Sequence, residues 1–291
     1  MNILLTGANG QVGWELRRSL APLGRVVAVD SREMDLADPA AIRRVVGEVR
    51  PALIVNPAAY TAVDKAEGEA ARARAVNAEA PALLAELAVQ GGALLVHYST
   101  DYVFDGGGAQ AWREDDAKGP LNVYGATKLA GEEAIAASGC RHLIFRTSWV
   151  YGARGANFLI TMRRLMRERP ELKIVDDQIG APTWCRGLAD ATAQVLAQVA
   201  SPARGADKPE PWGVYHMSNG GETSWHGFAQ AILDLEGMET PPRLLPIPSS
   251  DYPTPARRPL NSRLDNGKLA RVFGVRLPEW RDALKLCLDK S

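Results

Sequence analysis

The first half of the chain alternates short apolar runs with longer stretches rich in Ala, Leu, Glu and Arg. The apolar runs are nearly continuous, which is typical of strands that are covered on both faces. The stretches between them consist of helix formers, and several end at glycine. This alternation predicts βαβ units and therefore a parallel sheet. We expect strands at 3–6, 26–30, 53–56, 94–99 and 143–147 and helices at 11–23, 39–49, 66–90 and 123–138.

The second half of the chain is less regular. After Gly152 the alternation loosens, and proline-containing segments occur at 180–183, 200–212 and 240–259. The stretch 200–211 has hardly any apolar residue, which favours an exposed loop. We therefore expect an α/β protein in which a doubly wound parallel sheet occupies residues 1–151. A smaller mixed, mainly substrate-binding domain follows at residues 152–291, with an interleaved boundary, and a ligand is expected at the carboxyl ends of the strands.

Charge and cysteine content exclude several classes of function. The 291 residues include 34 Lys and Arg against 34 Asp and Glu, so no net field would hold nucleic acid or an anionic membrane. Cys140, Cys185 and Cys287 lie far apart without a Cys-x-x-Cys spacing, which indicates neither a disulfide framework nor a zinc site. No basic leader precedes an apolar stretch, and no apolar run is long enough to span a membrane. We expect a soluble protein of the reducing cytoplasm.

A glycine-rich loop follows the first expected strand. Gly7, Gly10 and Gly13 form a G-x-x-G-x-x-G run between a strand and a helix. Gly7 can adopt φ values closed to other residues, Gly10 lets a pyrophosphate approach the backbone, and Gly13 lets the helix pack against the sheet. The helix N-terminus then presents unpaired N–H groups to phosphates. The context favours a dinucleotide site of the Rossmann type, although a tight turn without a ligand would have the same sequence.

The residues after the second expected strand bear on the choice of cofactor. Asp30 ends that strand, where a carboxylate in a dinucleotide fold accepts hydrogen bonds from the adenosine ribose and favours NAD. Arg32 could instead pair with a 2′-phosphate and favour NADP. The sequence therefore predicts a nicotinamide cofactor, NADPH or NADH, and leaves the preference open.

Tyr124 and Lys128 lie four residues apart at the start of the helix expected at 123–138. They share one helix face, and Ser99, Thr100 and Asp101 end the preceding strand, so these side chains should meet at the crevice. A tyrosine hydroxyl has a pKa near about 10, and a nearby ammonium lowers that pKa. We expect Tyr124 to be an acid–base group, Lys128 to lower its pKa and hold a ribose hydroxyl, and Thr100 to bond the reacting carbonyl. A surface helix with a solvated lysine is the alternative.

With these residues assembled, the chain resembles the extended short-chain dehydrogenase/reductases and, among them, the dTDP-4-dehydrorhamnose reductase family. The resemblance runs from residue 2 to beyond residue 260 and is more specific than either motif alone. It implies reduction of the C4 ketone of dTDP-4-dehydro-L-rhamnose by NADPH or NADH. The stretches that carry it are 2–16, 60–67, 97–104, 121–125, 145–151, 177–183 and 252–259.

The resemblance also implies roles for individual residues. Tyr124 would donate the proton, with Lys128 as its partner and Thr100 beside them. The sugar would contact Val63, Thr100, Asp101 and Trp149, and we expect the diphosphate to be held by Arg257 and Arg258 from a proline-rich segment at 252–259. The cofactor would contact Gly7, Gly10, Gln11, Val12, Gly13, Asp30, Arg32, Asp35, Leu36, Ala59, Tyr60, Thr61, Tyr98, Tyr124 and Lys128. Val12, Val63 and Trp149 could equally be packing residues.

One departure from the family concerns metal binding. Some members form a dimer around a magnesium ion held by glutamates, and Glu15 matches one of these. The position of a second glutamate is Arg186 here, and a guanidinium cannot ligate a cation. We therefore expect no metal ion and leave a homodimer open. No metal-ligand spacing links His97, His142, His216 and His226, and His97 is expected to be a hydrogen-bonded core residue.

Related proteins supply competing hypotheses. A sugar-nucleotide 4,6-dehydratase shares both motifs, but its elimination uses an Asp-Glu pair after the threonine, and here Asp101 is followed by Tyr102. A 4-epimerase keeps its NAD bound, so release of oxidised cofactor would distinguish a reductase. The regulatory beta subunit of methionine adenosyltransferase resembles the same family and works as a binding partner, which a tight interaction with a transferase would reveal. The nucleotide and the exact deoxysugar stay open.

Overall fold

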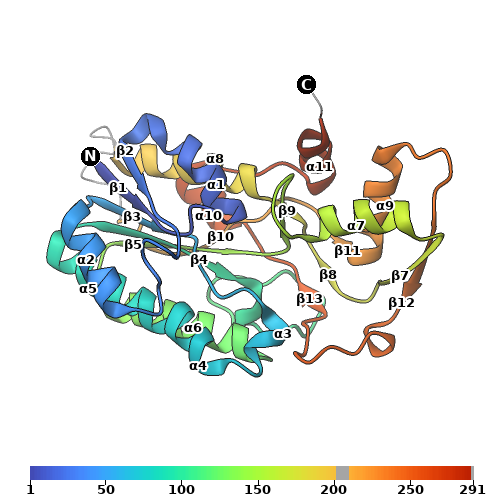
Figure 1. The fold of residues 1–291 in the computed structure, drawn as a ribbon, viewed down its shortest axis with the longest axis horizontal. Helices are drawn as coiled ribbons and strands as arrows, with labels where there is room; N and C mark the ends of the chain where they lie inside the picture. The colour runs from blue at the N-terminus through green and yellow to red at the C-terminus, as the bar shows by residue number, and fades with distance from the viewer. Residues whose placement is uncertain (201–209, 290–291) are drawn as a thin grey trace.

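A parallel sheet forms the centre of the protein (Figure 1). The structure, a computed structural model, describes residues 1–200 and 210–289, so most of the loop expected at 200–211 lies outside the described residues. Within the described part the sheet has six strands in the order β10-β5-β4-β3-β1-β2, and every neighbouring pair is parallel. The strands are β1 (Asn2–Leu5), β2 (Arg25–Ala28), β3 (Leu53–Asn56), β4 (Leu94–Thr100), β5 (His142–Thr147) and β10 (Gly213–His216).

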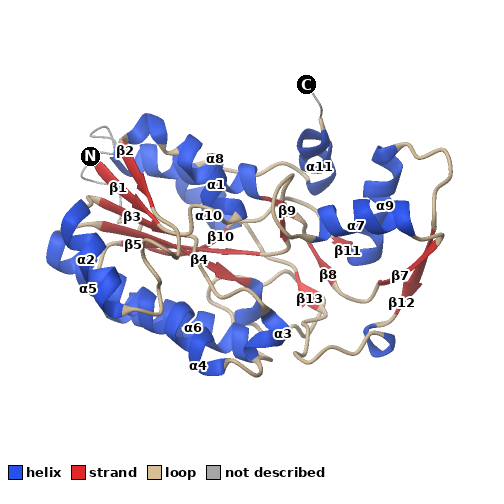
Figure 2. Ribbon diagram, viewed as in Figure 1, coloured by secondary structure: helices blue, strands red, loops and turns tan. Residues whose placement is uncertain are grey.

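Helices cover both faces of this sheet, which confirms the expected doubly wound α/β fold (Figure 2). Alternate residues of β1 point to opposite faces: Ile3 and Leu5 belong to one buried cluster and Leu4 to the other. One face packs against α1 (Gln11–Ser19), α8 (Cys185–Ala200) and α10 (Gly267–Phe273). The other packs against α2 (Pro39–Val49), α5 (Ala80–Gly91) and α6 (Val123–Ala137). Among the described helices none has both the length and the apolar character needed to cross a membrane.

The expected strands begin within one residue and end within two of those observed. The helix expected at 66–90 is wrong as a single element, because it is divided into α3 (Val63–Ala66), α4 (Ala70–Arg74), a π-helical turn (Ala75–Glu79) and α5. The helix expected at 11–23 is also too long, since α1 ends at Ser19 and a 3₁₀ turn at Ala21–Leu23 follows. Pro22 at the start of that turn has no N–H to continue the α-helix.

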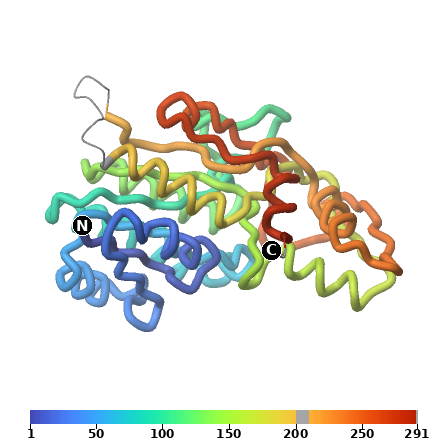
Figure 3. Tube along the Cα trace, turned by 90° about the horizontal axis from the view of Figure 1, so that it is seen from above, coloured from blue at the N-terminus to red at the C-terminus, as the bar shows by residue number. Residues whose placement is uncertain are grey.

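The C-terminal region forms a smaller lobe beside the carboxyl ends of the strands (Figure 3). It contains short mixed sheets, in which β8 (Ile179–Gly180) pairs antiparallel with β11 (Thr223–Ser224) and parallel with β13 (Asn261–Ser262). The parallel pairs are β7 (Glu171–Val175) with β12 (Arg243–Ile247) and β6 (Val150–Tyr151) with β9 (Thr183–Trp184). Helices α7 (Phe158–Glu168), α9 (Trp225–Glu236) and α11 (Trp280–Leu288) enclose a separate apolar cluster.

The two halves of the chain are not confined to separate lobes. Strand β10 lies beside β5 at the edge of the central sheet, and α8 packs against α1. The chain therefore leaves the central sheet after β5 and returns to it with α8, β10 and α10.

Two helical glycines allow a test of how closely α6 packs. A Cβ atom on Gly131 would lie 2.2 Å from the carbonyl oxygen of Asn77 in the π-helical turn, whereas a Cβ on Gly47 of α2 would meet no atom within 4 Å. We predict that Gly131→Ala lowers the free energy of unfolding by about 1 to 3 kcal/mol through overpacking. The matched Gly47→Ala variant should raise it by about 0.5 to 1 kcal/mol. Urea denaturation measures both, and equal effects would contradict this packing.

Candidate active site

The glycine loop has the geometry of an anion site. Gly7 adopts a left-handed φ of +59°, and a Cβ there would lie 2.9 Å from the Ala58 Cβ. A Cβ on Gly13 would lie 2.1 Å from the Gly7 carbonyl oxygen, so α1 can approach the sheet only with glycine at that position. Gly10 is the N-cap of α1 and supplies no side-chain cap, and the first turn has no acidic residue. The first N–H groups of α1 are therefore available to a phosphate.

Asp30 and Arg32 contact each other after β2. Asp30 accepts hydrogen bonds from Asn9 Nδ2 at 2.8 Å, from the Arg32 backbone N–H at 2.8 Å and from Arg32 Nη2 at 3.1 Å. The backbone hydrogen bond from Arg32 is the main cause of a lowered pKa of the Asp30 carboxyl, and the Arg32 side chain adds to it. The Arg32 side chain is 87% exposed and that of Asp30 only 17%. The aspartate is held in place, and the arginine is free to turn toward another anion.

The loop after β3 is held by a residue that the sequence reasoning missed. Asn77 in the π-helical turn accepts a hydrogen bond from the Tyr60 backbone N–H at 2.8 Å and donates to the Tyr60 carbonyl at 3.1 Å. Its amide also contacts Thr127 Oγ1 on α6 at 3.2 Å. One buried amide thus joins the loop that carries Ala59, Tyr60 and Thr61 to the helix that carries Tyr124 and Lys128. A polar residue within the apolar stretch 75–85 was the available signal.

Other predicted cofactor residues differ in where their side chains lie. Gln11 accepts a hydrogen bond from Asn157 at 2.8 Å, and Asp35 contacts Arg72 at 3.3 Å. Leu36 and Tyr98 are buried in the core, and the Tyr98 phenol bonds Thr192 on α8 at 2.5 Å. Only the Tyr98 backbone faces α6, because its carbonyl oxygen accepts from Lys128. Val12 packs at the edge of the core cluster that α1 covers.

Tyr124 lies at the carboxyl end of β4, in contact with Thr100. Burial raises the pKa of the Tyr124 phenol, the hydrogen bond with Thr100 lowers it, and the charges of Asp101 and Tyr102 raise it further. The expected lowering of this pKa is therefore wrong for the protein without a ligand. The Lys128 ammonium contacts His97 and the Tyr98 carbonyl oxygen, so burial determines the direction of the Tyr124 pKa shift. Tyr124 keeps its proton at neutral pH.

Lys128 is 1% exposed and is held by β4. Its Nζ donates to the Tyr98 carbonyl oxygen at 2.6 Å and lies 3.0 Å from His97 Nε2. Burial lowers the pKa of this amine to about 8, and the carboxylate of Glu132 on α6 opposes the shift. The side chain is fixed near the crevice and titrates close to neutral pH.

Asp101 presents a carboxylate beside Tyr124. It is 2% exposed, and its Oδ1 accepts from Thr100 Oγ1 at 3.1 Å. Its Oδ2 has no hydrogen bond of standard geometry among the described residues. Burial raises the pKa of this carboxyl to about 6, while the side chains of Ser262 and Thr100 lower it. A buried carboxylate oxygen in this state requires a donor.

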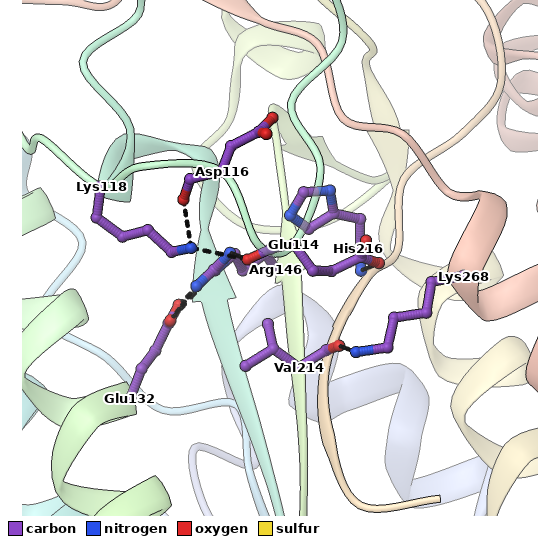
Figure 4. A network of polar contacts seen from close by, with 8 residues as sticks. All are labelled: Glu114, Asp116, Lys118, Glu132, Arg146, Val214, His216 and Lys268. Carbon is purple, nitrogen blue, oxygen red and sulfur yellow. Dashed lines mark hydrogen bonds and ion pairs between the residues drawn. The ribbon is translucent and has the colours of Figure 1, made fainter.

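A buried polar network anchors α6 one turn beyond Lys128 (Figure 4). Arg146 of β5 forms a two-pronged ion pair with Glu132, with Nη2–Oε2 and Nε–Oε1 distances of 2.6 and 2.9 Å. Arg146 and Lys118 both donate to the Glu114 carbonyl oxygen, at 3.1 and 2.8 Å. The Glu114 carboxylate accepts from the His216 backbone N–H at 2.9 Å. The network joins α6, β5, β10 and the loop that precedes α6.

A cavity of about 380 Å³ has Arg257 and Arg258 in its wall. Arg258 pairs with Asp64 at 2.6 Å and also interacts with Tyr102, whose ring meets the Tyr124 ring edge-on at 5.6 Å. The exposed Arg257 is tied through its carbonyl oxygen to the Asn122 side chain at 2.8 Å. Other lining residues include Asp105, Leu121, Gln178, Ser249, Tyr252 and Thr254.

The predicted sugar residues Val63 and Trp149 lie on different elements. Val63 begins α3, next to Asp64. Trp149 has a left-handed φ of 48°, unusual for a bulky residue, and stacks on Trp225 of α9 with ring centroids 3.7 Å apart. Gly180 permits this, since a Cβ there would lie 2.9 Å from the Trp149 ring. Sequence reasoning did not identify Trp225.

The positions linked to a bridging metal lie on α1 and α8. Arg186 Nε is 3.9 Å from Asp190 Oδ2 on the same helix. Within residues 1–200 and 210–289, no three His, Cys, Asp or Glu side chains are grouped as metal ligands. The absence of a bound metal ion stays a prediction, and a homodimer stays open.

Comparison with known proteins identifies the family. The sequence model of the RmlD substrate-binding domain family matches residues 1–291. A dTDP-4-dehydrorhamnose reductase of Burkholderia thailandensis is 53% identical over 99% of this chain and 98% of its own length. The dTDP-4-dehydrorhamnose reductase of Bacillus anthracis, solved in complex with NADP, is 34% identical, with a TM-score of 0.91 over 100% of this chain and 99% of that one. A solved Clostridium acetobutylicum dTDP-4-dehydrorhamnose reductase has the same TM-score at 36% identity over 99% of both chains. A glycine loop, Tyr124 and Lys128 one turn apart on α6, and this full-length similarity together show that the chain belongs to the RmlD substrate-binding domain family.

Proposed function

We propose that this chain is an NAD(P)H-dependent oxidoreductase that reduces the C4 ketone of dTDP-4-dehydro-L-rhamnose to give dTDP-L-rhamnose, the last step of dTDP-rhamnose biosynthesis. The observation that carries the proposal is the placement of a protonated Tyr124 beside Thr100 and Asp101 at the carboxyl end of β4. The relatives named above carry this activity in their names. We place the reaction in the cytoplasm.

The chain's own geometry fits a nicotinamide dinucleotide. The uncapped first turn of α1 would hold the pyrophosphate, and Asp30 or Arg32 would contact the adenosine ribose. Ala59, Tyr60 and Thr61 lie in the loop that Asn77 holds against α6. When bound, the reduced nicotinamide supplies the hydride for the carbonyl carbon. Lys128 and Tyr124 are the α6 residues proposed to face it.

The proton comes from Tyr124. Reduction of a ketone adds a hydride to carbon and a proton to oxygen, and a phenol with a raised pKa arrives protonated. Loss of that proton leaves a phenolate, which the buried Lys128 ammonium stabilises through its charge. The Thr100 hydroxyl, which donates to Asp101 Oδ1 in this structure, would turn to donate to the same oxygen and orient it. The neighbouring Tyr102 interacts with Arg258 instead.

The substrate is proposed to lie between Asp101 and the cavity. The unbonded Oδ2 of Asp101 fits a sugar hydroxyl, which is a donor. The cavity wall supplies Arg257 and Arg258 for the diphosphate, and since Arg258 is already paired with Asp64, Arg257 has the freer charge. Val63 and Trp149 are proposed to flank the sugar.

The proposal is tested by incubating the protein with dTDP-4-dehydro-L-rhamnose and either NADH or NADPH while following the absorbance of the reduced nicotinamide. Stoichiometric oxidation with formation of dTDP-L-rhamnose is expected. A 4-epimerase would show no net oxidation of added cofactor, and a regulatory subunit would show no turnover. A 4,6-dehydratase would also leave this substrate unchanged, because a 6-deoxysugar has no 6-hydroxyl to eliminate. Any of these results would contradict the proposed reaction.

We predict that Tyr124→Phe lowers kcat by about 10²- to 10⁴-fold, because the phenyl ring cannot donate a proton. Cofactor affinity, measured by fluorescence titration, should change little. Tyr215→Phe is the matched control, since its hydroxyl bonds the Pro211 carbonyl at 2.7 Å, away from the site. Retention of half the wild-type kcat in Tyr124→Phe would refute the role of Tyr124.

Asp30 and Arg32 make a prediction about cofactor choice. A 2′-phosphate carries about −1.5 to −2 charges and is repelled by Asp30 but attracted by Arg32. Arg32→Ala should weaken NADPH binding by about tenfold and spare NADH, whereas Asp30→Ala should weaken NADH and spare or improve NADPH. Arg164→Ala, which removes another exposed arginine, on α7, is the control. The measurement is the dissociation constant of each variant for NADH and for NADPH. Equal effects on the two cofactors would show that neither residue discriminates at the 2′ position.

We predict that the buried Asp101 carboxylate lowers the stability of the folded protein but is needed for activity. In the unfolded chain its pKa is 3.8, so between pH 3.8 and about 6 the folded protein binds more protons, and stability falls as the pH rises through that window. Asp101→Asn removes the buried charge and should raise the free energy of unfolding by about 1 to 3 kcal/mol at pH 7.5. The gain should vanish near pH 4, while kcat/KM falls. Denaturation at both pH values measures this, and a gain independent of pH would rule out the carboxylate as its cause.

A further inference from the structure

A row of buried polar side chains runs from the glycine loop to Lys128. Thr6 Oγ1 lies 2.6 Å from the side-chain oxygen of Asn56, whose amide nitrogen lies 3.1 Å from His97 Nδ1. His97 Nε2 then lies 3.0 Å from Lys128 Nζ. The exposed fractions of the four residues are 1%, 0%, 0% and 1%. Apolar packing does not account for polar side chains at these positions, because burying a polar group costs free energy unless the group is hydrogen-bonded.

The sheet order places this row. Thr6 follows β1, Asn56 ends β3 and His97 lies in β4, and these strands are neighbours. Asn56 and His97 are direct partners in the β3–β4 register. Lys128 reaches His97 from α6, on the face opposite to the Tyr98 ring. Each member is therefore fixed by backbone structure rather than by a mobile loop.

The donor count determines how His97 must be protonated. An ammonium carries three N–H donors and no acceptor. Lys128 uses one donor on the Tyr98 carbonyl, so the imidazole nitrogen facing it must offer a lone pair. In a neutral imidazole the other nitrogen then carries the proton. Nδ1–H needs an acceptor, so this tautomer requires the Asn56 amide to be turned by 180° from the orientation given above. Its oxygen then accepts from Nδ1–H, and its nitrogen donates to Thr6 Oγ1.

We propose that His97 is the positioning residue for Lys128: as the neutral Nδ1–H tautomer, fixed by Asn56, it accepts a hydrogen bond from the ammonium and holds that charge at the crevice. The inference rests on the proposed function only where it states how loss of the His97–Lys128 hydrogen bond changes catalysis. His97 touches neither substrate nor cofactor in this arrangement. It acts through Lys128.

The surrounding charges support this arrangement. Lys128 and burial together lower the pKa of His97 well below its usual value, so the ring stays neutral. From α6, Glu132 faces Lys128, and its charge is already balanced by Arg146 of β5. The Tyr98 phenol of β4 points away to Thr192, and Tyr124 stays protonated. His97 is therefore the neutral acceptor on which the ammonium depends besides a backbone carbonyl.

The first experiment observes the tautomer directly in the cofactor-free protein. The chain has four histidines, so selective ¹⁵N labelling with long-range ¹H–¹⁵N correlation resolves them, and His97→Gln assigns the His97 signals by their loss. Between about pH 6 and 8, we expect a neutral His97 with the proton on Nδ1. In Lys128→Met the preference for this tautomer should weaken. A proton on Nε2 at pH 6, or ordinary titration of His97, would overturn the proposal.

The second experiment measures the pH profile of kcat. His97→Leu removes the acceptor, so the Lys128 ammonium should lose its proton more easily, and the basic limb should move down by about one to two pH units. His97→Gln, whose amide oxygen can replace Nε2, should restore most of the wild-type profile. His142→Leu, at the far end of β5, is the matched control. KM for the sugar should not change.

The two experiments separate this inference from the proposed function. If the enzyme reduces the dTDP-sugar but His97→Leu leaves the profile unmoved, His97 is only structural and the inference fails. If the dTDP-sugar is not reduced, the proposed function fails, and the tautomer measurement still decides the bond to Lys128. Should His97→Leu not fold, the wild-type spectrum and the Gln variant suffice.

Discussion

The orientation of helix α6 depends on one buried ion pair. Glu132 and Arg146 have side chains only 4% and 2% exposed, and either charge alone would be strongly destabilising there. They must therefore stay together, and because Arg146 belongs to β5, their pairing sets the rotation of α6 against the sheet. Tyr124 and Lys128 lie about two turns and one turn before Glu132 on the same helix. The ion pair thus directs both toward the carboxyl ends of the strands.

Much of the fold follows from local sequence pattern. Strand β3 and helix α2 occupy the predicted residues, because a strand covered on both faces must be apolar throughout and a helix is bounded by its caps. The π-helical turn at Ala75–Glu79 could not be predicted in this way. Its extra backbone residue turns the Asn77 amide toward the Tyr60 loop, which follows β3 and precedes α3. Helical periodicity could not indicate that Asn77 bonds a loop 17 residues earlier in the sequence.

In the site, too, some features follow from local sequence and others depend on tertiary contacts. The positions of the glycine loop and of Tyr124 and Lys128 follow from short spacings along the chain. The electrostatic state of Tyr124 does not, because it depends on burial and on the atoms that receive the Lys128 hydrogen bonds. Those atoms belong to β4 and are fixed by the tertiary fold. A histidine and an arginine within otherwise apolar strands, at positions 97 and 146, were the signals for the two buried networks.

The return of the chain to its first sheet has a consequence for biosynthesis. Strand β10 pairs Gly213 with Leu143, and Leu188 and Val195 of α8 share a buried cluster with Leu16 of α1 and with Leu20, which follows it. While the ribosome has made only the first half, α1 alone covers that face of the sheet, and the apolar side chains that α8 and α10 later cover stay in water. Contacts between such distant residues also slow folding. The nascent chain therefore exposes an aggregation-prone apolar surface until the segments that cover it, from α8 onward, have been made. Chaperones can bind this surface during that interval.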